Sequence, residues 1–384
     1  MFAQPADKVK DKKSPYEFTV IKDLPNTSVK NQFRTGTCWS FSSTSFLEAE
    51  LLRTTKKEYD LSDMWSVYCT YLAKADRYAR LHGETNFPTG GACGDVLWTM
   101  TNYGLVPESV YNGLQYGEPK HNHKVLTPLL KESLKLTVDQ AKTLDSNWKF
   151  SFVAILNAYL GAAPKEFTYE GKKYTPQSFA SSLKLNASDY VGFTSYTHHP
   201  FYTQFAVEVP DNWLQHQNYN VTLEEFQQIA QNAIENGYTF VWGGDVSSRG
   251  FSYKNGIAIV ADEDNPESLA GTDRDRWESL NKKERTDAVY KFETLVAEKA
   301  ITQEERQKAY DYWDATDDHG MHAVGLAKDQ NGNVYFKIKN SWDTDNLYGG
   351  YLYMSMPFFK LNTLDILVHK NAVPAAIKAK LGIK

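Results

Sequence analysis

The spacing of apolar residues predicts a chain whose first two thirds are mainly helical. Apolar positions recur at helical spacing from Leu61 to Ala79, where Ser62 can cap the start and Gly83 can close the end. Thr222 and Glu225 form a capping-box pattern before another apolar stripe. Further helices are expected over residues 39–52, 95–103, 126–136 and 148–160, and after the Thr-Pro pair at 175–176.

Strands are expected mainly in the last third. Short runs rich in β-branched and aromatic residues, typical of strands, lie at 238–242, 257–260 and 351–356. An apolar alternating run opens at His322, and the next one ends at Asn340. Asn331 and Gly332 between them give a hairpin signal, so the two runs are predicted to pair as antiparallel strands in a small β-barrel.

These patterns predict an α+β fold with a helical half, a β-barrel half and a large, mainly helical insertion. The charged stretch at 262–314 is expected to be a solvated helical excursion. The expected divisions are an N-terminal arm at 1–28, a helical half at 29–120, the insertion at 121–237, the barrel half at 238–360 and a C-terminal arm at 361–384.

Cys38 is the strongest candidate for chemistry. It stands where Gly36 allows a tight turn and a helix is expected to begin, so the helix N-terminus would favour its thiolate. Gln32 precedes it closely enough for the Gln32 side chain and the Cys38 backbone N–H to stabilise one oxyanion. The alternative is a buried free thiol, the commoner fate of a cysteine.

His322 and Asn340 are the candidate partners of Cys38. If both lie at the same end of paired strands, the Asn340 side chain can accept a hydrogen bond from the imidazole and fix its tautomer. Considered alone, His322 is more often a satisfied core histidine, and Asn340 an ordinary residue at a strand end.

Together these motifs resemble a known family. Gln32 with the run Gly-Thr-Cys-Trp-Ser at 36–40 is similar to the nucleophile motif of papain-like cysteine peptidases, and Asn-Ser-Trp at 340–342 is similar to their asparagine motif. Cys38 and His322 are about twice as far apart as simple members need, which indicates the branch of bleomycin hydrolase and aminopeptidase C. The resemblance runs from about Val29 to the C-terminus.

The resemblance implies a papain-like fold and a thiol peptidase, most simply an aminopeptidase. Cys38, His322 and Asn340 would form the catalytic site, with Gln32 in the oxyanion hole and no metal or organic cofactor. It also implies that Trp342 shields the bond between His322 and Asn340 from water. Substrate contacts are expected at Trp39, Gly90, Gly91 and Trp342.

Gly90 and Gly91 precede a predicted helix. Their bare backbones would let an extended peptide lie close and pair with main-chain groups. The alternative is a simple loop before that helix.

The C-terminal tail bears on specificity. In this branch the C-terminal arm enters the cleft and its carboxylate meets the α-amino group of the substrate. Here the chain ends at Lys384, whose cation would repel a substrate ammonium if it reached the cleft. An endopeptidase of the same fold, a non-catalytic binding or regulatory protein, and an acyltransferase that uses the same thioester therefore remain alternatives.

Composition limits the partners and the compartment. The chain has 42 basic and 47 acidic residues, a formal net charge of −5, which does not favour nucleic-acid binding. No apolar run reaches the 18 or so residues of a membrane span. Peptides are the expected partners, and the resemblance implies a homo-hexamer. Three cysteines fit a reducing compartment, and the resemblance implies the cytoplasm, unless residues 1–4 are the remnant of an export signal.

No metal site is expected. His198 and His199 would point to opposite faces of an extended segment and so make a poor chelating pair. His319 and His322 could hold zinc on a helix, but Gly320 between them and the strand that follows argue against a helix.

Overall fold

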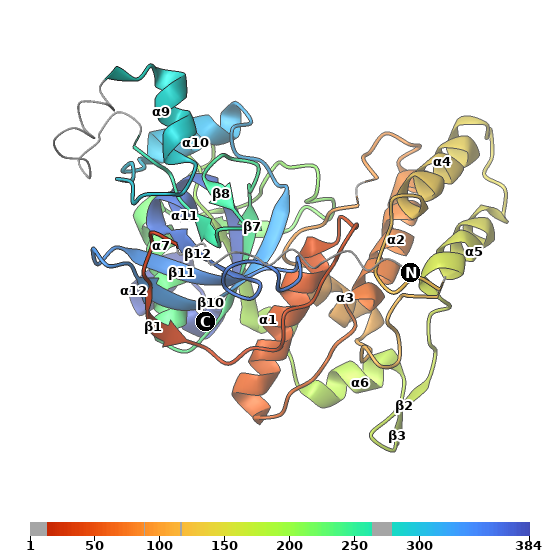
Figure 1. Ribbon diagram of the computed structural model, residues 1–384. Helices are drawn as coiled ribbons and strands as arrows, with labels where there is room; N and C mark the ends of the chain where they lie inside the picture. Colours follow the sequence, from red (N-terminus) through yellow and green to blue (C-terminus); the bar gives the residue numbers. More distant parts are fainter. Residues whose placement is uncertain (1–13, 88, 116, 263–278) are drawn as a thin grey trace, which may run out of the picture.

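The computed structural model describes residues 14–384 except 88, 116 and 263–278. Figure 1 shows two halves side by side: α1 to α6 gather in one, and most of the strands lie in the other with the remaining helices around them. Residues 1–13 of the predicted N-terminal arm and residues 263–278 of the predicted charged excursion lie outside the described residues.

The helical half is built around α1, which is buried from Cys38 to Leu51. It packs against α2 and α3 on one side and against β7 and β10 on the other, so its first residue lies between the two halves. The elements of this half are α1 (Cys38–Thr55), α2 (Asp63–Arg80), α3 (Asp95–Tyr103), α4 (Leu126–Asp139), α5 (Trp148–Leu160), α6 (Pro176–Leu183) and the hairpin of β2 (Phe167–Tyr169) and β3 (Lys172–Tyr174).

The other half contains one large mixed sheet. Its strand order is β5-β6-β4-β13-β7-β10-β11-β12-β9-β8, and β1 also pairs with β10. Two neighbouring pairs, β4 with β6 and β9 with β12, are parallel and the others are antiparallel. The strands are β1 (Thr19–Asp23), β4 (Tyr190–Thr194), β5 (Gln204–Ala206), β6 (Gln217–Asn220), β7 (Phe240–Gly244), β8 (Phe251–Ser252), β9 (Ile257–Ala258), β10 (His319–Lys328), β11 (Val334–Lys339), β12 (Tyr351–Ser355) and β13 (Thr363–His369).

Helices pack on this sheet through apolar faces. Thr222 and Glu225 form the predicted capping box of α7 (Leu223–Glu235), and the buried face of α7 stacks Phe226 on Phe359 with ring centroids 5.2 Å apart. Burial of a side chain of this size contributes roughly 1.5–3 kcal/mol. The other helices are α9 (Lys282–Val289), α10 (Gln303–Asp311), α11 (Met356–Asn362), α12 (Ala375–Leu381) and the short 3-10 turns η1 (Ala187–Asp189) and η2 (Lys370–Ala372).

The local predictions hold best for helices. The structure has α3 and α5 with the predicted bounds, and Ser62 caps α2 by accepting a hydrogen bond from the Trp65 backbone N–H at 3.0 Å. The predicted hairpin is also present, with Gly332 at φ +87° in the turn between β10 and β11. The overall prediction of an α+β fold with both halves is therefore confirmed.

The predicted divisions need three corrections. The segment expected as a C-terminal arm, 361–384, supplies β13, which lies in the interior of the sheet between β4 and β7. The insertion at 121–237 is not one unit, because α4 to α6 pack with the helical half and β4 to α7 with the sheet half. The N-terminal arm contributes β1 to the edge of β10.

The charged excursion is not simply solvated. Arg306 on α10 is 1% exposed and donates hydrogen bonds to the carbonyls of Ser195 at 2.7 Å and Lys360 at 2.9 Å. These bonds to backbone carbonyls hold α10 on the sheet half.

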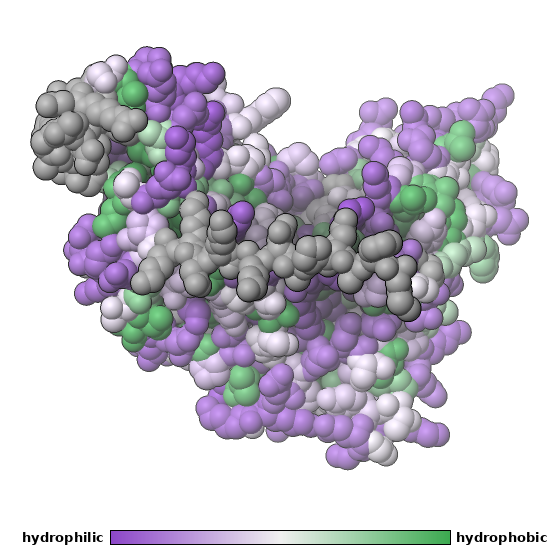
Figure 2. Space-filling view, viewed as in Figure 1, coloured by the Kyte–Doolittle hydropathy of each residue, from purple (hydrophilic) through white to green (hydrophobic). Residues whose placement is uncertain are grey.

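The surface of the helical half carries apolar side chains on α4, α5 and the segments that flank them. Figure 2 shows them as green patches among hydrophilic residues on that side. Phe150 is 75% exposed and Leu136 is 64% exposed.

Candidate active site

Cys38 is the first residue of α1, as predicted. The first turn of α1 is closed by the Thr37 carbonyl, which accepts hydrogen bonds from the backbone N–H groups of Ser40 at 2.9 Å and Phe41 at 3.2 Å. A glycine is needed at Gly36 because a side chain there would overlap Thr89. The chain therefore delivers the sulfur to a helix N-terminus between the two halves.

The histidine that shares a pocket with Cys38 is His319, the first residue of β10. His319 Nε2 lies 2.8 Å from Asn340 Oδ1, and its ring lies against that of Trp342 with centroids 4.5 Å apart. Because Nε2 donates to the carboxamide oxygen, Nδ1 is left as the acceptor in the neutral ring. His319, and not His322, is therefore the histidine that bonds Asn340 and lies against the Trp342 ring.

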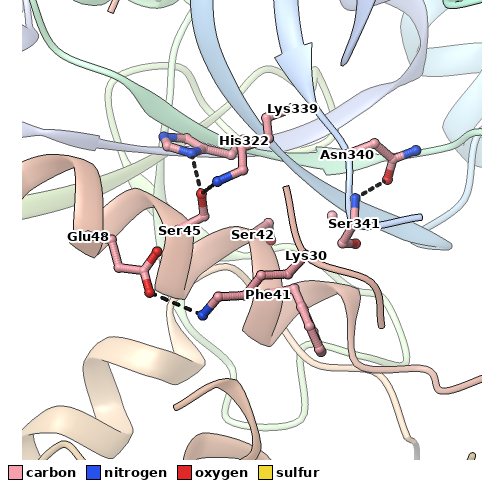
Figure 3. Close-up of a pocket in the computed structure, with 10 residues that line it drawn as sticks. Lys30, Phe41, Ser42, Ser45, Glu48, His322, Lys339, Asn340 and Ser341 are labelled. Atoms are coloured by element: carbon pink, nitrogen blue, oxygen red, sulfur yellow. Dashed lines mark hydrogen bonds and ion pairs between the residues drawn. The ribbon is translucent and has the colours of Figure 1, made fainter. Parts of the chain in front are cut away.

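The prediction that Asn340 orients His322 is wrong. His322 is fully buried in a separate small cavity, where its Nδ1 lies 2.9 Å from Ser45 Oγ. Ser45 Oγ in turn accepts from Lys339 Nζ at 2.8 Å. Figure 3 shows His322 directed toward Ser45 and Asn340 directed away from it. His322 is thus the core histidine that the sequence left as the alternative.

A β-bulge explains why the predicted histidine was the wrong one. Near the turn Lys328 pairs with Val334, and that register, continued evenly, would set His322 opposite Asn340. The register instead shifts between Ala323 and Gly325, so His322 pairs with Lys339. A shift by one residue exchanges the two faces of a strand. Asn340 therefore shares a face with His319.

Gly320 lets β10 approach the start of α1. A Cβ at this position would lie 3.4 Å from Trp39 Cα and 3.0 Å from Ser42 Oγ. The backbone of Gly320 also hydrogen-bonds the Cys38 sulfur. Gly320 therefore has a packing role beside Cys38.

Burial favours the neutral forms of the Cys38 and His319 side chains. Desolvation raises the pKa of the Cys38 thiol to about 11, although hydrogen bonds from the Gly320 and Trp39 backbone oppose this shift. Desolvation also lowers the pKa of His319 to about 4, and the bond to Asn340 opposes it. Burial thus opposes the thiolate that the helix N-terminus favours.

Gln32 is held firmly beside the site. Its Oε1 accepts from Ser341 Oγ at 2.6 Å, and its Nε2 donates to the Thr35 carbonyl at 2.8 Å. One N–H of the carboxamide remains for another acceptor. Its contribution to an oxyanion hole stays a prediction.

Two of the expected substrate contacts, Trp39 and Gly91, line the pocket with Cys38. A Cβ at Gly91 would lie 2.9 Å from the Trp39 ring, so this glycine makes room for packing as well. Gly90 does not present an open face, because a side chain there would overlap the Asp211 carboxylate. Substrate binding by Gly90 and Trp342 stays a prediction.

The expectation for Lys384 needs correction. The end of the chain does not enter the pocket of Cys38: α12 packs on the sheet half through Ile377, and Lys380 Nζ pairs with Glu225 Oε1 of α7 at 2.6 Å. The Ile383 backbone N–H bonds back to the Lys378 carbonyl at 3.1 Å. These contacts direct the tail away from the site.

Removal of the Lys384 side chain is therefore expected to have little effect. Lys384→Ala should leave kcat/KM for a substrate with a free amino group within about twofold, since surface changes remote from a site are nearly neutral. Steady-state kinetics of the variant beside the unchanged protein would check this. A tenfold change in kcat/KM would contradict this and indicate that the tail acts in the cleft.

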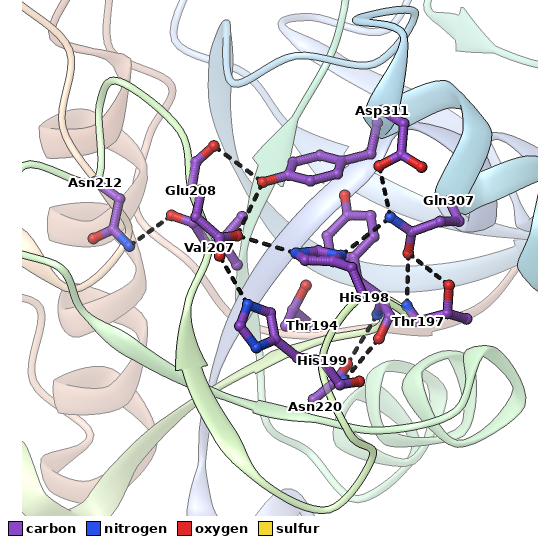
Figure 4. Close-up of polar contacts among 12 residues, drawn as sticks. Thr194, Thr197, His198, His199, Val207, Glu208, Asn212, Asn220, Gln307 and Asp311 are labelled. Atoms are coloured by element: carbon purple, nitrogen blue, oxygen red, sulfur yellow. Dashed lines mark hydrogen bonds and ion pairs between the residues drawn. The ribbon is translucent and has the colours of Figure 1, made fainter.

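His198 and His199 do not point apart as predicted. In Figure 4 both rings face Glu208, with Nε2 of His198 3.1 Å from Oε2 and Nε2 of His199 2.8 Å from Oε1. These three groups lie close enough together to surround a metal ion.

The surroundings of His198 do not fit a metal ligand. Gln307 Oε1 accepts from the Thr197 backbone N–H at 2.6 Å, so its Nε2 is the atom that donates to His198 Nδ1 at 3.1 Å. Nδ1 is then an acceptor, and Nε2 carries the proton and donates a hydrogen bond to Glu208 Oε2. A ligating histidine needs the reverse, a free Nε2 with an acceptor at Nδ1.

Comparisons with known proteins agree with this geometry. Residues 17–168 match the family described as papain family cysteine protease, and residues 271–383 match the peptidase C1-like family. Aminopeptidase C of Lactococcus lactis is 22% identical over 92% of this chain and 83% of its own length. Aminopeptidase G of Lactobacillus delbrueckii is 24% identical over 91% of this chain and 82% of its own length.

A solved structure shares the fold. PepW from Lactobacillus rhamnosis superposes with a TM-score of 0.68 at 19% identity, covering 95% of this chain and 84% of that one. In the part of the chain that the structure describes, no helix is both long and apolar enough to cross a bilayer.

Proposed function

Because the chain belongs to the papain-like cysteine peptidases, in the branch of bleomycin hydrolase and aminopeptidase C, we propose that it removes N-terminal residues from peptides with Cys38, His319 and Asn340. The observation that carries the assignment of these residues is the 2.8 Å bond from His319 to Asn340 in the pocket that Cys38 lines. The names of the aminopeptidase relatives support the choice of an aminopeptidase.

Acylation begins with transfer of the Cys38 proton to His319 Nδ1. The sulfur attacks the amide carbon, and the carbonyl electrons move to the oxygen. The backbone N–H of Cys38, which has no intrahelical acceptor at a helix start, and the remaining N–H of Gln32 stabilise the oxyanion. His319 then protonates the leaving amine, the C–N bond breaks and a thioester remains.

Deacylation uses the same groups. His319 removes a proton from water, and the hydroxide oxygen attacks the thioester carbon. The C–S bond breaks to release the carboxylic acid product, and His319 returns its proton to the Cys38 sulfur. Asn340 holds the imidazole in one tautomer throughout, and Trp342 covers their hydrogen bond. No metal or organic cofactor is needed for either step.

A substrate pair tests this function. Purified protein is offered an aminoacyl fluorogenic amide with a free amino group and the same compound N-acetylated, with and without prior treatment by iodoacetamide. We expect turnover of the free compound that alkylation abolishes. Turnover of neither compound would contradict the peptidase, and preference for the acetylated compound would indicate an endopeptidase. An added amine that captures the acyl group faster than water would indicate an acyltransferase.

The compartment, the partners and the oligomeric state are proposals as well. Three unpaired cysteines favour a reducing compartment such as the cytoplasm. Peptides are the proposed partners. A hexamer, which the family resemblance implies, stays a prediction that light scattering can check.

A further inference from the structure

The segment after β5 brings a carboxylate into the pocket of Cys38. Val207, Val209, Asp211 and Asn212 line this pocket together with Cys38 and His319. The segment is held in place because Asn212 Nδ2 donates to the Val207 carbonyl at 3.1 Å, and the Asp211 backbone N–H donates to Asp317 Oδ2 at 2.9 Å. Asp211 therefore sits in a fixed loop and not on a mobile surface turn.

The Asp211 side chain lies against the bare Cα of Gly90. Among the described residues, none donates a hydrogen bond to either carboxylate oxygen. Burial, with Asp317 nearby, raises the pKa of Asp211 to about 7, and Lys74 opposes the shift. A half-buried carboxylate that accepts no hydrogen bond from the protein is open to a ligand that brings its own donors.

The other carboxylates nearby have donors. Asp95 accepts from Trp213 Nε1 at 2.7 Å and lies 2.8 Å from His216 Nε2. Asp365 accepts from Asn218 Nδ2 at 3.1 Å and faces the Cys93 thiol. Asp317 accepts from the backbone of Asp211. Of the three carboxylates that line the pocket, Asp211 is the one that accepts no hydrogen bond from any other described residue.

Negative charge exceeds positive charge in this pocket. Asp211, Asp317 and Asp365 all line it. Lys74 is the nearby cation that acts on Asp211, but its Nζ is engaged by the Gly90 carbonyl. An ammonium group that entered beside Cys38 would therefore meet a favourable field and free acceptor atoms.

We propose that Asp211 binds the α-ammonium group of the peptide substrate and so selects peptides with a free N-terminus. This inference rests on the proposed peptidase function. The tail of the chain packs elsewhere, on α7, so the anchor comes from the loop after β5. A lysine side chain of the substrate offers the same chemistry, and the experiment below separates the two sources.

Asp211→Asn tests the assignment because it keeps the shape and removes the charge. The substrates are an aminoacyl fluorogenic amide, its N-acetylated form, and an N-acetylated form with lysine before the cleaved bond. We expect kcat/KM for the free-amine substrate to fall ~10- to 100-fold, as for loss of one charged partner in a partly open site. Turnover of the acetylated substrate should change less than about twofold.

Glu208→Gln is the matched control, since Glu208 lies on the same segment but faces His198 and His199 outside the pocket. It should leave the ratio of the two activities unchanged. An unchanged ratio in Asp211→Asn, or an equal loss on both substrates, would overturn the proposal. A loss confined to the lysine substrate would assign Asp211 to side-chain recognition and overturn it too.

Calorimetry separates this inference from the catalytic function. In protein with Cys38→Ala, a dipeptide amide with a free amino group should bind at least ~10-fold more tightly than its N-acetylated form, and Asp211→Asn should abolish that difference. Absence of turnover in the unchanged protein would defeat the peptidase proposal alone. Equal affinity for the two dipeptides would defeat the Asp211 proposal.

Discussion

Replacing His319 by alanine is expected to lower kcat/KM for a peptide amide by ~10³- to 10⁴-fold, whereas replacing His322 by glutamine should leave it within a few fold. The physical reason is the face that each ring occupies. His319 shares the pocket of Cys38 and bonds Asn340, while His322 is enclosed with Ser45 and Lys339. Steady-state kinetics of the two variants measures the difference directly.

In stability the order of the two variants should be reversed, with His322→Gln losing more free energy of unfolding than His319→Ala. His322→Gln is expected to lower the free energy of unfolding by about 1–3 kcal/mol, because it disturbs a fully buried, hydrogen-bonded side chain. Denaturant melts of both variants provide this control. A catalytic loss in His322→Gln with a normal melt would reverse the assignment of the two histidines.

Replacing Cys38 by alanine is expected to reduce turnover by ~10⁴-fold or more, since no other group forms the thioester. Cys93→Ser is the matched control. Cys93 lines the same pocket, but its Sγ lies 3.4 Å from Asp365 Oδ1, and burial raises its pKa well above the usual range. A serine can keep that hydrogen bond, so Cys93→Ser should retain activity.

Alkylation gives a second test of whether Cys38 is the reactive cysteine. Iodoacetamide should label Cys38, which has His319 as a proton acceptor in its pocket, ahead of Cys69, which is 1% exposed inside α2. Peptide mass mapping identifies the labelled residue. Turnover that survives complete labelling of Cys38 would remove it from the mechanism.

The sequence predicted helices well because their signals are local. Ser62 capped α2, Thr222 and Glu225 formed a capping box, and α3 spans residues 95–103, each as expected. The position of Cys38 was also predictable, because a glycine turn before a helix places it at the helix start. These features depend on residues within a few positions of one another.

The predictions that failed concern strand register and contacts between residues far apart in the sequence. The bulge between Ala323 and Gly325 has no strong sequence signal, yet it decides whether His319 or His322 faces Asn340. Asp211 gave no signal either, because its place beside Gly90 is set by the loop after β5 and by Asp317. The central place of β13 was missed because strand order follows from the whole sheet.

The place of β13 has a consequence for synthesis of the protein. β4 and β7 each leave one edge open until residues 363–369 arrive between them, and the ribosome makes these residues last among the strands. The nascent chain must therefore carry two incomplete sheet fragments with exposed edges, which favour aggregation. Translation that stops before β13 should yield no active peptidase, even though Cys38, His319 and Asn340 have already been made, and it would also leave out Asp365 of the Cys38 pocket.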